Sequence, residues 1–259
     1  DKAEFTSDLA AKAALNAIET SGLSINDIDL IIVATATPDR SAPSTAAIVQ
    51  DKIKAYNAVA FDISAVCSGF LFAMSVASQY ISSGIYDNVL VIGADIFSRI
   101  TDWTRRDAVF FGDGAGAAIL THSDTDSGFL SFRLYTDGSG KWNFTVPAGG
   151  SEMPASKETL NDGLHFFQMN GKAVYETGIK VLPMAINQVL ADSGYTIDDI
   201  DYLISEWSLL KKHLSLGYKL KYNIPDDVVN AIEEPIVLDD NVYIPKVILS
   251  EDDFILEGT

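Results

Sequence analysis

The chain is 259 residues long and 47% hydrophobic, so it can bury a large core, and intrinsic disorder is excluded. Eighteen Lys and Arg against 36 Asp and Glu give a net charge of −18, which disfavours binding to nucleic acids and to anionic membranes. No apolar run resembles a membrane span or a signal peptide, and a single cysteine cannot form an internal disulfide. We therefore expect a cytoplasmic protein with a reduced thiol.

The first part of the chain alternates between helical and strand patterns. Residues 7–22 carry helix formers with apolar residues on one face, and residues 29–36 read as a buried strand. Residues 58–64 and 88–95 read as two more strands, and residues 68–84 between them read as a helix. Alternating strand and helix units predict an α/β fold with a largely parallel sheet.

The helix predicted at residues 68–84 is apolar on nearly every side. A helix without a polar face belongs between layers of a structure, because no side of it gains from contact with water. We therefore expect its turns from Phe70 to Ser82 to be buried at the centre of the fold.

The middle of the chain is rich in glycine. Residues 112–120, "GDGAGAAIL", read as a turn that runs into a strand, and residues 128–135 read as a neighbouring strand. A phosphate-binding loop needs a helix after its glycines, so tight chain packing is the favoured interpretation here. Residues 135–165 lack a clear period and predict a long surface excursion, and residues 171–194 predict a helix.

Two segments of the chain, one near its start and one near residue 200, form an internal repeat. "GLSINDIDLII" begins at Gly22 and "GYTIDDIDYLI" begins at Gly194, each after an amphipathic helix and each ending in a strand pattern. The shared order of helix, glycine, loop and strand indicates duplication. Fewer residues follow Gly194 than the first half needs, so we expect two similar α/β halves with the second incomplete.

The lone cysteine, Cys67, stands where a strand pattern ends and a helix pattern begins. Free N–H groups at a helix start stabilise a thiolate and lower the pKa of the thiol, and Gly69 lets another chain come close. A free cysteine is also a common small core residue. From spacing alone, both a nucleophile and a structural cysteine remain open.

The segments "FDISAVCSGFLFAMSVASQYISSG", "NVLVIGAD" and "FFGDGAGAAIL" closely resemble the β-ketoacyl-acyl-carrier-protein synthase III family of the thiolase superfamily. "ATATPDRSAPSTAAIVQ", "YTDGSG" and "MNGKAVYE" also sit where that family has comparable stretches. The resemblance implies a thiolase-like layered α/β/α/β/α fold made of two duplicated halves. We expect residues 1–165 to form the first half, residues 166–204 to begin the second, and residues 205–259 to form an unaligned acidic, β-rich tail.

The resemblance also implies an acyltransferase of fatty-acid or polyketide synthesis. In that family a cysteine takes an acyl group from a coenzyme A thioester, and malonyl-acyl carrier protein then loses CO2 and condenses with it. The implied partners are acyl-CoA and acyl carrier protein, with coenzyme A as part of a substrate and no separate cofactor. Family members pair through the first half, so we expect a homodimer.

Residue by residue, the resemblance makes Cys67 the catalytic nucleophile. It implies substrate-binding roles along the acyl and pantetheine tunnel for Phe97, Phe111, Phe144, Met169 and Gly171, and on the adenine of coenzyme A for Arg106. Without the resemblance, the aromatic residues read as ordinary core and Arg106 reads as a solvated surface charge.

Two catalytic residues of the family have no match in this chain. The family's His and Asn are unmatched, and His122, His165 and His213 do not fall in the catalytic pattern. The family's first strand and the tryptophan that faces Arg106 across the adenine lie before Asp1. We therefore expect a truncated, fused or frame-altered chain.

The unmatched residues leave a second interpretation open, a non-catalytic dimerising scaffold or truncated homologue. A third interpretation, a cysteine hydrolase of another fold, is disfavoured because "SAVCSG" lacks the first glycine of a nucleophile elbow.

Overall fold

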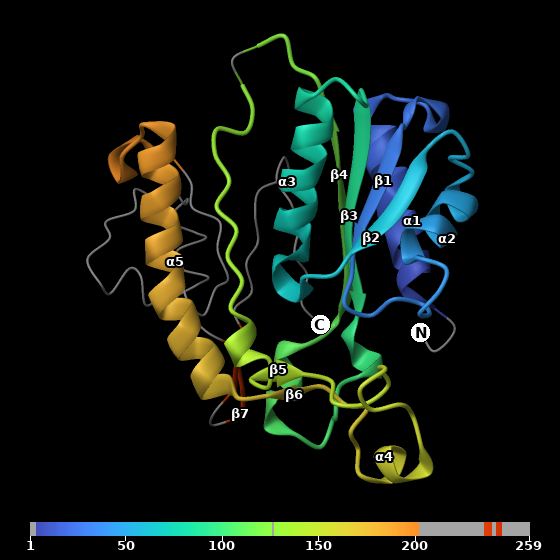
Figure 1. The fold of residues 1–259 in the computed structure, drawn as a ribbon, viewed down its shortest axis with the longest axis vertical. Coiled ribbons are helices and arrows are strands. Elements are labelled where there is room, and N and C mark those ends of the chain that lie inside the picture. The colour runs from blue at the N-terminus through green and yellow to red at the C-terminus, as the bar shows by residue number, and fades with distance from the viewer. Residues whose placement is uncertain (1–3, 126, 202–235, 240–241, 245–259) are drawn as a thin grey trace. The chain divides into compact units, whose positions relative to one another are not determined.

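A computed structural model describes residues 4–125, 127–201, 236–239 and 242–244, and the chain divides into two compact units, residues 1–178 and 179–259. The first unit holds a four-stranded sheet in the order β2-β1-β3-β4 (Figure 1). Its strands are β1 (Leu30–Ala34), β2 (Val59–Ile63), β3 (Asn88–Ile96) and β4 (Asp113–Thr121). The first three strands are parallel and β4 is antiparallel to β3, which confirms the predicted α/β sheet.

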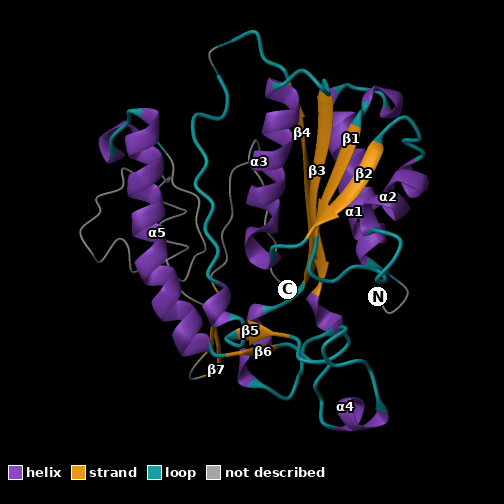
Figure 2. Ribbon diagram, in the orientation of Figure 1, coloured by secondary structure: helices purple, strands orange, loops and turns teal. Residues whose placement is uncertain are grey.

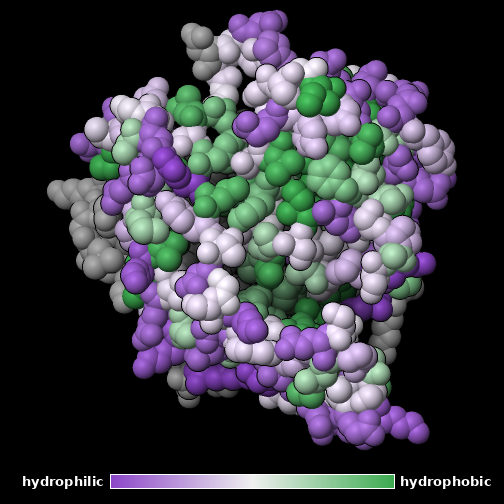
Figure 3. Space-filling view, in the orientation of Figure 1, coloured by the Kyte–Doolittle hydropathy of each residue, from purple (hydrophilic) through white to green (hydrophobic). Residues whose placement is uncertain are grey.

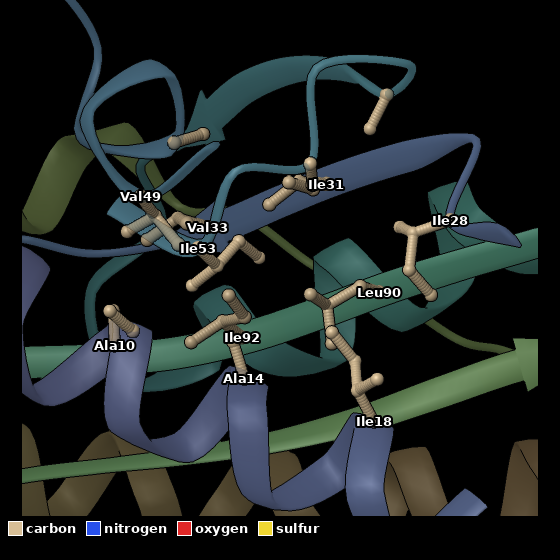
Figure 4. Close-up of a cluster of buried hydrophobic side chains, with 14 of the residues drawn as sticks. Ala10, Ala14, Ile18, Ile28, Ile31, Val33, Val49, Ile53, Leu90 and Ile92 are labelled. Atoms are coloured by element: carbon tan, nitrogen blue, oxygen red, sulfur yellow. The ribbon is translucent and has the colours of Figure 1, made fainter. Parts of the chain in front are cut away.

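Helices cover both faces of this sheet. α1 (Thr6–Ser21) and α2 (Thr45–Ile53) lie on one face, and α3 (Gly69–Ser82) lies on the other (Figure 2). Figure 4 shows Ala10, Ala14 and Ile18 of α1 pointing toward β1 and β3. β1 is buried along its whole length because it has a strand on each side and helices on each face.

The sequence analysis did not assign α2. Hydrogen bonds to polar side chains fix the start of α2. The Ser44 hydroxyl group accepts one from Ala47 N at 3.2 Å. The two carboxylate oxygens of Asp62, in β2, accept from the backbone N–H groups of Thr45 and Ala46, each at 2.7 Å. A distant carboxylate therefore caps the helix, and such a cap has no local signal in the sequence.

The prediction that α3 is buried at the centre of the fold holds for its face on the sheet, whereas other parts of the helix are partly buried or exposed. One face, including Ala73 and Ala77, packs on the sheet without exposure, whereas Leu71 is 60% exposed. Figure 3 shows hydrophobic residues gathered on the surface where α3 lies. Besides the exposed Leu71, α3 thus carries apolar residues that are partly buried against the core, among them Phe70, Met74 and Val76.

The glycine-rich stretch differs from its prediction in extent. β4 begins at Asp113, so the glycines belong to the strand itself, with Gly116 opposite Gly93 of β3. A strand in place of a loop and helix leaves no phosphate cradle here, as expected. Residues 128–135 form no strand, which corrects that prediction: they pair with no described strand, and β-prone residues need a partner to stay in a sheet.

The remaining described elements are mostly short. The predicted excursion contains β5 (Phe144–Thr145) and α4 (Lys157–Asn161), and β5 pairs antiparallel with β6 (Gln168–Met169). α5 (Gly171–Ser193) confirms the predicted long helix, and β7 (Ile236–Asp239) pairs with β8 (Val242–Ile244). None of the helices described is long and apolar enough to pass through a membrane.

The two copies of the repeat adopt the same local geometry. α1 and α5 end at Gly22 and Gly194, and each glycine has φ of 74°. A 3₁₀ turn follows each glycine, and in both turns an aspartate accepts a backbone hydrogen bond at 2.8 Å, Asp27 from Ser24 N and Asp199 from Thr196 N. The predicted duplication is therefore supported up to Asp201. The strand pattern after it, and most of the tail, lie outside the described residues.

The burial of α3 predicts different costs for its two faces. Replacing Ala73 by Leu should overpack the contact with the sheet and lower the free energy of unfolding by about 1–3 kcal/mol. The matched change on the outer face, Leu71→Ala, should alter it by no more than about 0.5 kcal/mol. Urea denaturation measures both values; a large loss for Leu71→Ala would show that the outer face is covered.

Candidate active site

Cys67 lies in a single 3₁₀ turn, Val66–Ser68, that joins β2 to α3. The thiol is exposed and is not in a disulfide. Ser68 is the N-cap residue of α3, and its side chain makes no capping hydrogen bond. No side chain therefore caps the first turn of α3, while the backbone N–H groups of Ser68 and Gly69 donate to the carbonyl oxygens of Ala65 and Val66 in the preceding turn. The predicted place of Cys67 between strand and helix is confirmed.

The residue before the cysteine is conformationally strained. Val66 has φ of 47°, in the left-handed region that β-branched residues rarely adopt. Such strain costs about 1–3 kcal/mol and persists only where the surroundings enforce it, commonly at functional sites. The strain on this turn therefore favours a functional role for Cys67 over a purely structural one.

Two contacts fix the segments on either side of the turn, the start of α3 and the end of β2, against β1 and the residue after it. A Cβ atom placed on Gly69 would lie 3.2 Å from the Cβ of Ala34, so a larger residue would fit only if its neighbours moved by a few tenths of an ångström. At the other end, Thr35 N donates to the carbonyl oxygen of Ile63 at 3.2 Å. The glycine that was predicted to admit a neighbouring chain thus admits β1.

The three predicted tunnel phenylalanines gather around a fourth, Phe167. The ring centroid of Phe167 lies 4.2 Å from that of Phe144, 4.8 Å from that of Phe111 and 5.7 Å from that of Phe97. Phe97 and Phe111 stack with centroids 5.3 Å apart. The sequence analysis missed Phe167, which is 5% exposed, because nothing local separates it from its exposed neighbour Phe166.

Met169 and Gly171 lie beside this aromatic cluster. Met169 pairs with Phe144 across β5 and β6, and Gly171 is the first residue of α5. The Met169 methyl carbon lies 3.7 Å from the position that a Cβ on Gly171 would occupy. The structure thus brings five of the predicted residues, Phe97, Phe111, Phe144, Met169 and Gly171, into one neighbourhood.

Arg106 precedes Phe111 of the aromatic cluster by one short helix. It is exposed and begins a short 3₁₀ helix, Arg106–Phe110. Its neighbour Arg105 donates two hydrogen bonds to the carboxylate of Asp107, at 3.0 and 2.9 Å. These hydrogen bonds hold the pKa of the Asp107 carboxyl below its usual value. The fork holds the Arg105 guanidinium beside Asp107, and both Arg105 and Arg106 are exposed.

The two histidines in the described ranges make contacts of their own. His165 Nε2 lies 2.9 Å from Thr159 Oγ1, and His122 Nε2 lies 3.7 Å from a carboxylate oxygen of Asp124. His213 lies outside the described residues. No group of three or more metal-binding side chains occurs in the part of the chain that is described.

Comparison with known proteins gives a consistent result. The sequence profile of the 3-oxoacyl-(acyl-carrier-protein) synthase III family matches residues 61–138. The β-ketoacyl-acyl-carrier-protein synthase III of Clostridioides difficile is 43% identical over 266 residues, which cover 99% of this chain and 80% of that protein. This alignment extends past residue 204, where the resemblance found in the sequence analysis ends.

Other relatives are longer than this chain. The enzyme of the same name from Caldanaerobacter subterraneus is 47% identical over 205 residues, covering 79% of this chain and 62% of that protein. The crystal structure of 3-oxoacyl-acyl-carrier-protein synthase III from Aquifex aeolicus matches with a TM-score of 0.68 and 35% identity, covering 76% of this chain and 60% of that one. The chain therefore spans less than two thirds of these two proteins.

The position of Cys67 predicts a reactive thiol. Iodoacetamide should label the folded protein with a half-maximal rate at a pH below about 8.5, the usual value for a cysteine, because a thiolate is stabilised at a helix start. Cys67→Ser should abolish labelling. A midpoint at or above the usual value would contradict a nucleophilic role.

The aromatic cluster predicts a large cost for removing its central ring. Phe167→Ala should lower the free energy of unfolding by about 3–5 kcal/mol, since it removes a buried ring. The control Phe129→Ala removes a 53% exposed ring that contacts only Phe132 among the described aromatic rings, and should cost no more than about 1.5 kcal/mol. Equal losses in urea denaturation would contradict the central place of Phe167.

Proposed function

Because the chain belongs to the β-ketoacyl-acyl-carrier-protein synthase III family, we propose that it transfers acyl groups from coenzyme A thioesters through Cys67. The observation that carries the proposal is the place of this thiol, exposed on a strained turn at the start of α3. The turn follows the carboxyl end of β2, and the carboxyl ends of parallel strands are where α/β sheets place their ligands.

In the first step the Cys67 thiolate attacks the carbonyl carbon of an acyl-CoA. The carbon–sulfur bond to coenzyme A breaks, and coenzyme A leaves as its thiolate, which takes a proton from water. Backbone N–H groups near the start of α3 stabilise the oxyanion that forms during the attack. The product is an acyl-cysteine on Cys67.

In the second step malonyl-acyl carrier protein loses CO2, and the carbanion attacks the acyl-cysteine. The bond to the Cys67 sulfur breaks, the thiolate is restored, and a β-ketoacyl chain remains on the carrier protein. This is the reaction that starts fatty-acid or polyketide chains. Acyl carrier protein and acyl-CoA are thus the partners that the proposal requires, and a homodimer is its proposed assembly.

The aromatic cluster supplies an apolar lining for such a substrate. In the proposal Phe97, Phe111 and Phe144 line the acyl and pantetheine path, with Met169 and Gly171 beside the pantetheine arm. Phe167 packs against all three phenylalanines, so it orders the lining. Arg106, exposed and clear of the Arg105–Asp107 fork, is the residue proposed for the adenine.

Condensation requires more catalytic side chains than acylation does. The family's His and Asn stabilise the thioester carbonyl while CO2 leaves, and neither has a match in this sequence. Among the described residues, His122 and His165 contact an aspartate and a threonine instead. The proposal is therefore acylation at Cys67 with weak condensation; the second candidate, a dimerising scaffold, is favoured by the same two unmatched positions.

The proposal predicts that the two half-reactions separate. Incubation with acetyl-CoA should add the mass of one acetyl group, and Cys67→Ser should prevent it. Malonyl-acyl carrier protein should be decarboxylated at least on the order of 100-fold more slowly than by a family member that carries both residues, because the loss of a single transition-state donor typically costs about 100- to 1000-fold. Intact-mass spectrometry and a CO2-release assay measure the two steps.

The two measurements also separate the candidates. An unmodified protein after prolonged incubation with acetyl-CoA would favour the scaffold. Condensation at the rate of a complete enzyme would show that residues outside the described ranges supply the missing groups, and His213→Ala would then be the first variant to examine.

A further inference from the structure

One carboxylate ties together the carboxyl ends of β1 and β3. Oδ1 of Asp95, near the end of β3, accepts from Ala36 N at 2.8 Å and Thr37 N at 3.0 Å. It also accepts from the hydroxyl groups of Thr35 at 3.1 Å and Thr37 at 2.7 Å. Asp95 therefore fixes the three residues that follow β1.

The link is reinforced in the opposite direction. Thr37 Oγ1 accepts from Ile96 N at 2.8 Å while it donates to Asp95, so the segment that follows β1 and the end of β3 hold each other. Four donors on one oxygen are more than a neutral carbonyl group ordinarily receives, and a charged acceptor makes each of these hydrogen bonds stronger.

The segment that Asp95 fixes is also the support of the Cys67 turn. Thr35 N donates a hydrogen bond to the carbonyl oxygen of Ile63, which lies four residues before Cys67. Gly69, two residues after Cys67, packs closely on Ala34: a Cβ atom placed on Gly69 would lie 3.2 Å from the Cβ of Ala34. The end of β2 before the turn and the start of α3 after it therefore contact residues 34–35, and Thr35 is itself bound by Asp95.

We infer that Asp95 is a positioning residue for Cys67: it acts through the segment Thr35–Thr37 to hold the nucleophile turn at the start of α3. The inference rests on the proposed function, because it concerns the same thiol. Asp95 accepts hydrogen bonds from backbone N–H groups and threonine hydroxyl groups. The proposed reaction gives it no contact with the substrate.

A second aspartate provides a matched control at the other end of the same strands. Oδ2 of Asp29, directly before β1, accepts from Asp87 N and Asn88 N, both at 2.9 Å, and so ties the start of β1 to the start of β3. Asp29 and Asp95 are both partly buried and both bind backbone N–H groups. They differ in which end of the sheet they join.

The experiment compares Asp95→Ala, Asp95→Asn and Asp29→Ala with the unchanged chain, using iodoacetamide labelling of the folded protein across a range of pH. Asp95→Ala should slow labelling at pH 7 by about tenfold, which corresponds to a rise of about one unit in the labelling midpoint. Asp95→Asn keeps an acceptor oxygen and should recover part of the rate. Asp29→Ala should lower the urea midpoint but leave the labelling profile unchanged.

Each outcome has one meaning. The inference is overturned if Asp95→Ala and Asp95→Asn label like the unchanged chain, or if Asp29→Ala shifts the profile as much as they do. Should Asp95→Ala fail to fold, Asp95→Asn against Asp29→Ala decides the question in the same way. An unchanged chain that does not label at all would overturn the proposed function instead, because the thiol would then not be reactive before any substitution.

Discussion

The position of Cys67 depends on how closely α3 can approach β1. The helix begins with glycine, and the neighbouring atom on the sheet side is the Cβ of Ala34, the smallest side chain after glycine. A Cβ atom on the glycine would lie 3.2 Å from that atom, so a larger residue there requires the helix start or the strand to shift by a few tenths of an ångström. Since the cysteine turn is only three residues long, such a shift would move the thiol with it.

The strand ends around this contact are polar. Aspartates recur where strands meet loops: Asp62 caps α2, Asp95 binds the segment after β1, and Asp29 joins the starts of β1 and β3. A carboxylate can satisfy several backbone N–H groups that no sheet or helix reaches. The apolar interior of the sheet therefore ends in fixed, hydrogen-bonded loops, and a rigid edge of this kind can hold a strained turn such as that of Val66.

The two duplicated segments show how much of the backbone geometry the local sequence specifies. The segments after Gly22 and Gly194 share a positive φ, a 3₁₀ turn and an aspartate that closes that turn, although their neighbours in the chain differ. Local hydrogen bonds and one glycine conformation suffice to specify this unit. Residues 128–135 show the opposite case, because their strand propensity produces no strand without a described partner.

Hydrophobic period, glycine positions and one motif around Cys67 determined α1, α3 and α5, the three parallel strands, the duplication and the family, because each of these is written in neighbouring residues. Tertiary structure alone decided the cap of α2 by Asp62, the single buried face of α3, the central place of Phe167 and the link from Asp95 to the cysteine turn. In each of these cases the partners are far apart in the sequence or are distinguished only by burial. A carboxylate or a ring carries no local sign of which distant atoms it will meet, so only the packed chain assigns it a partner.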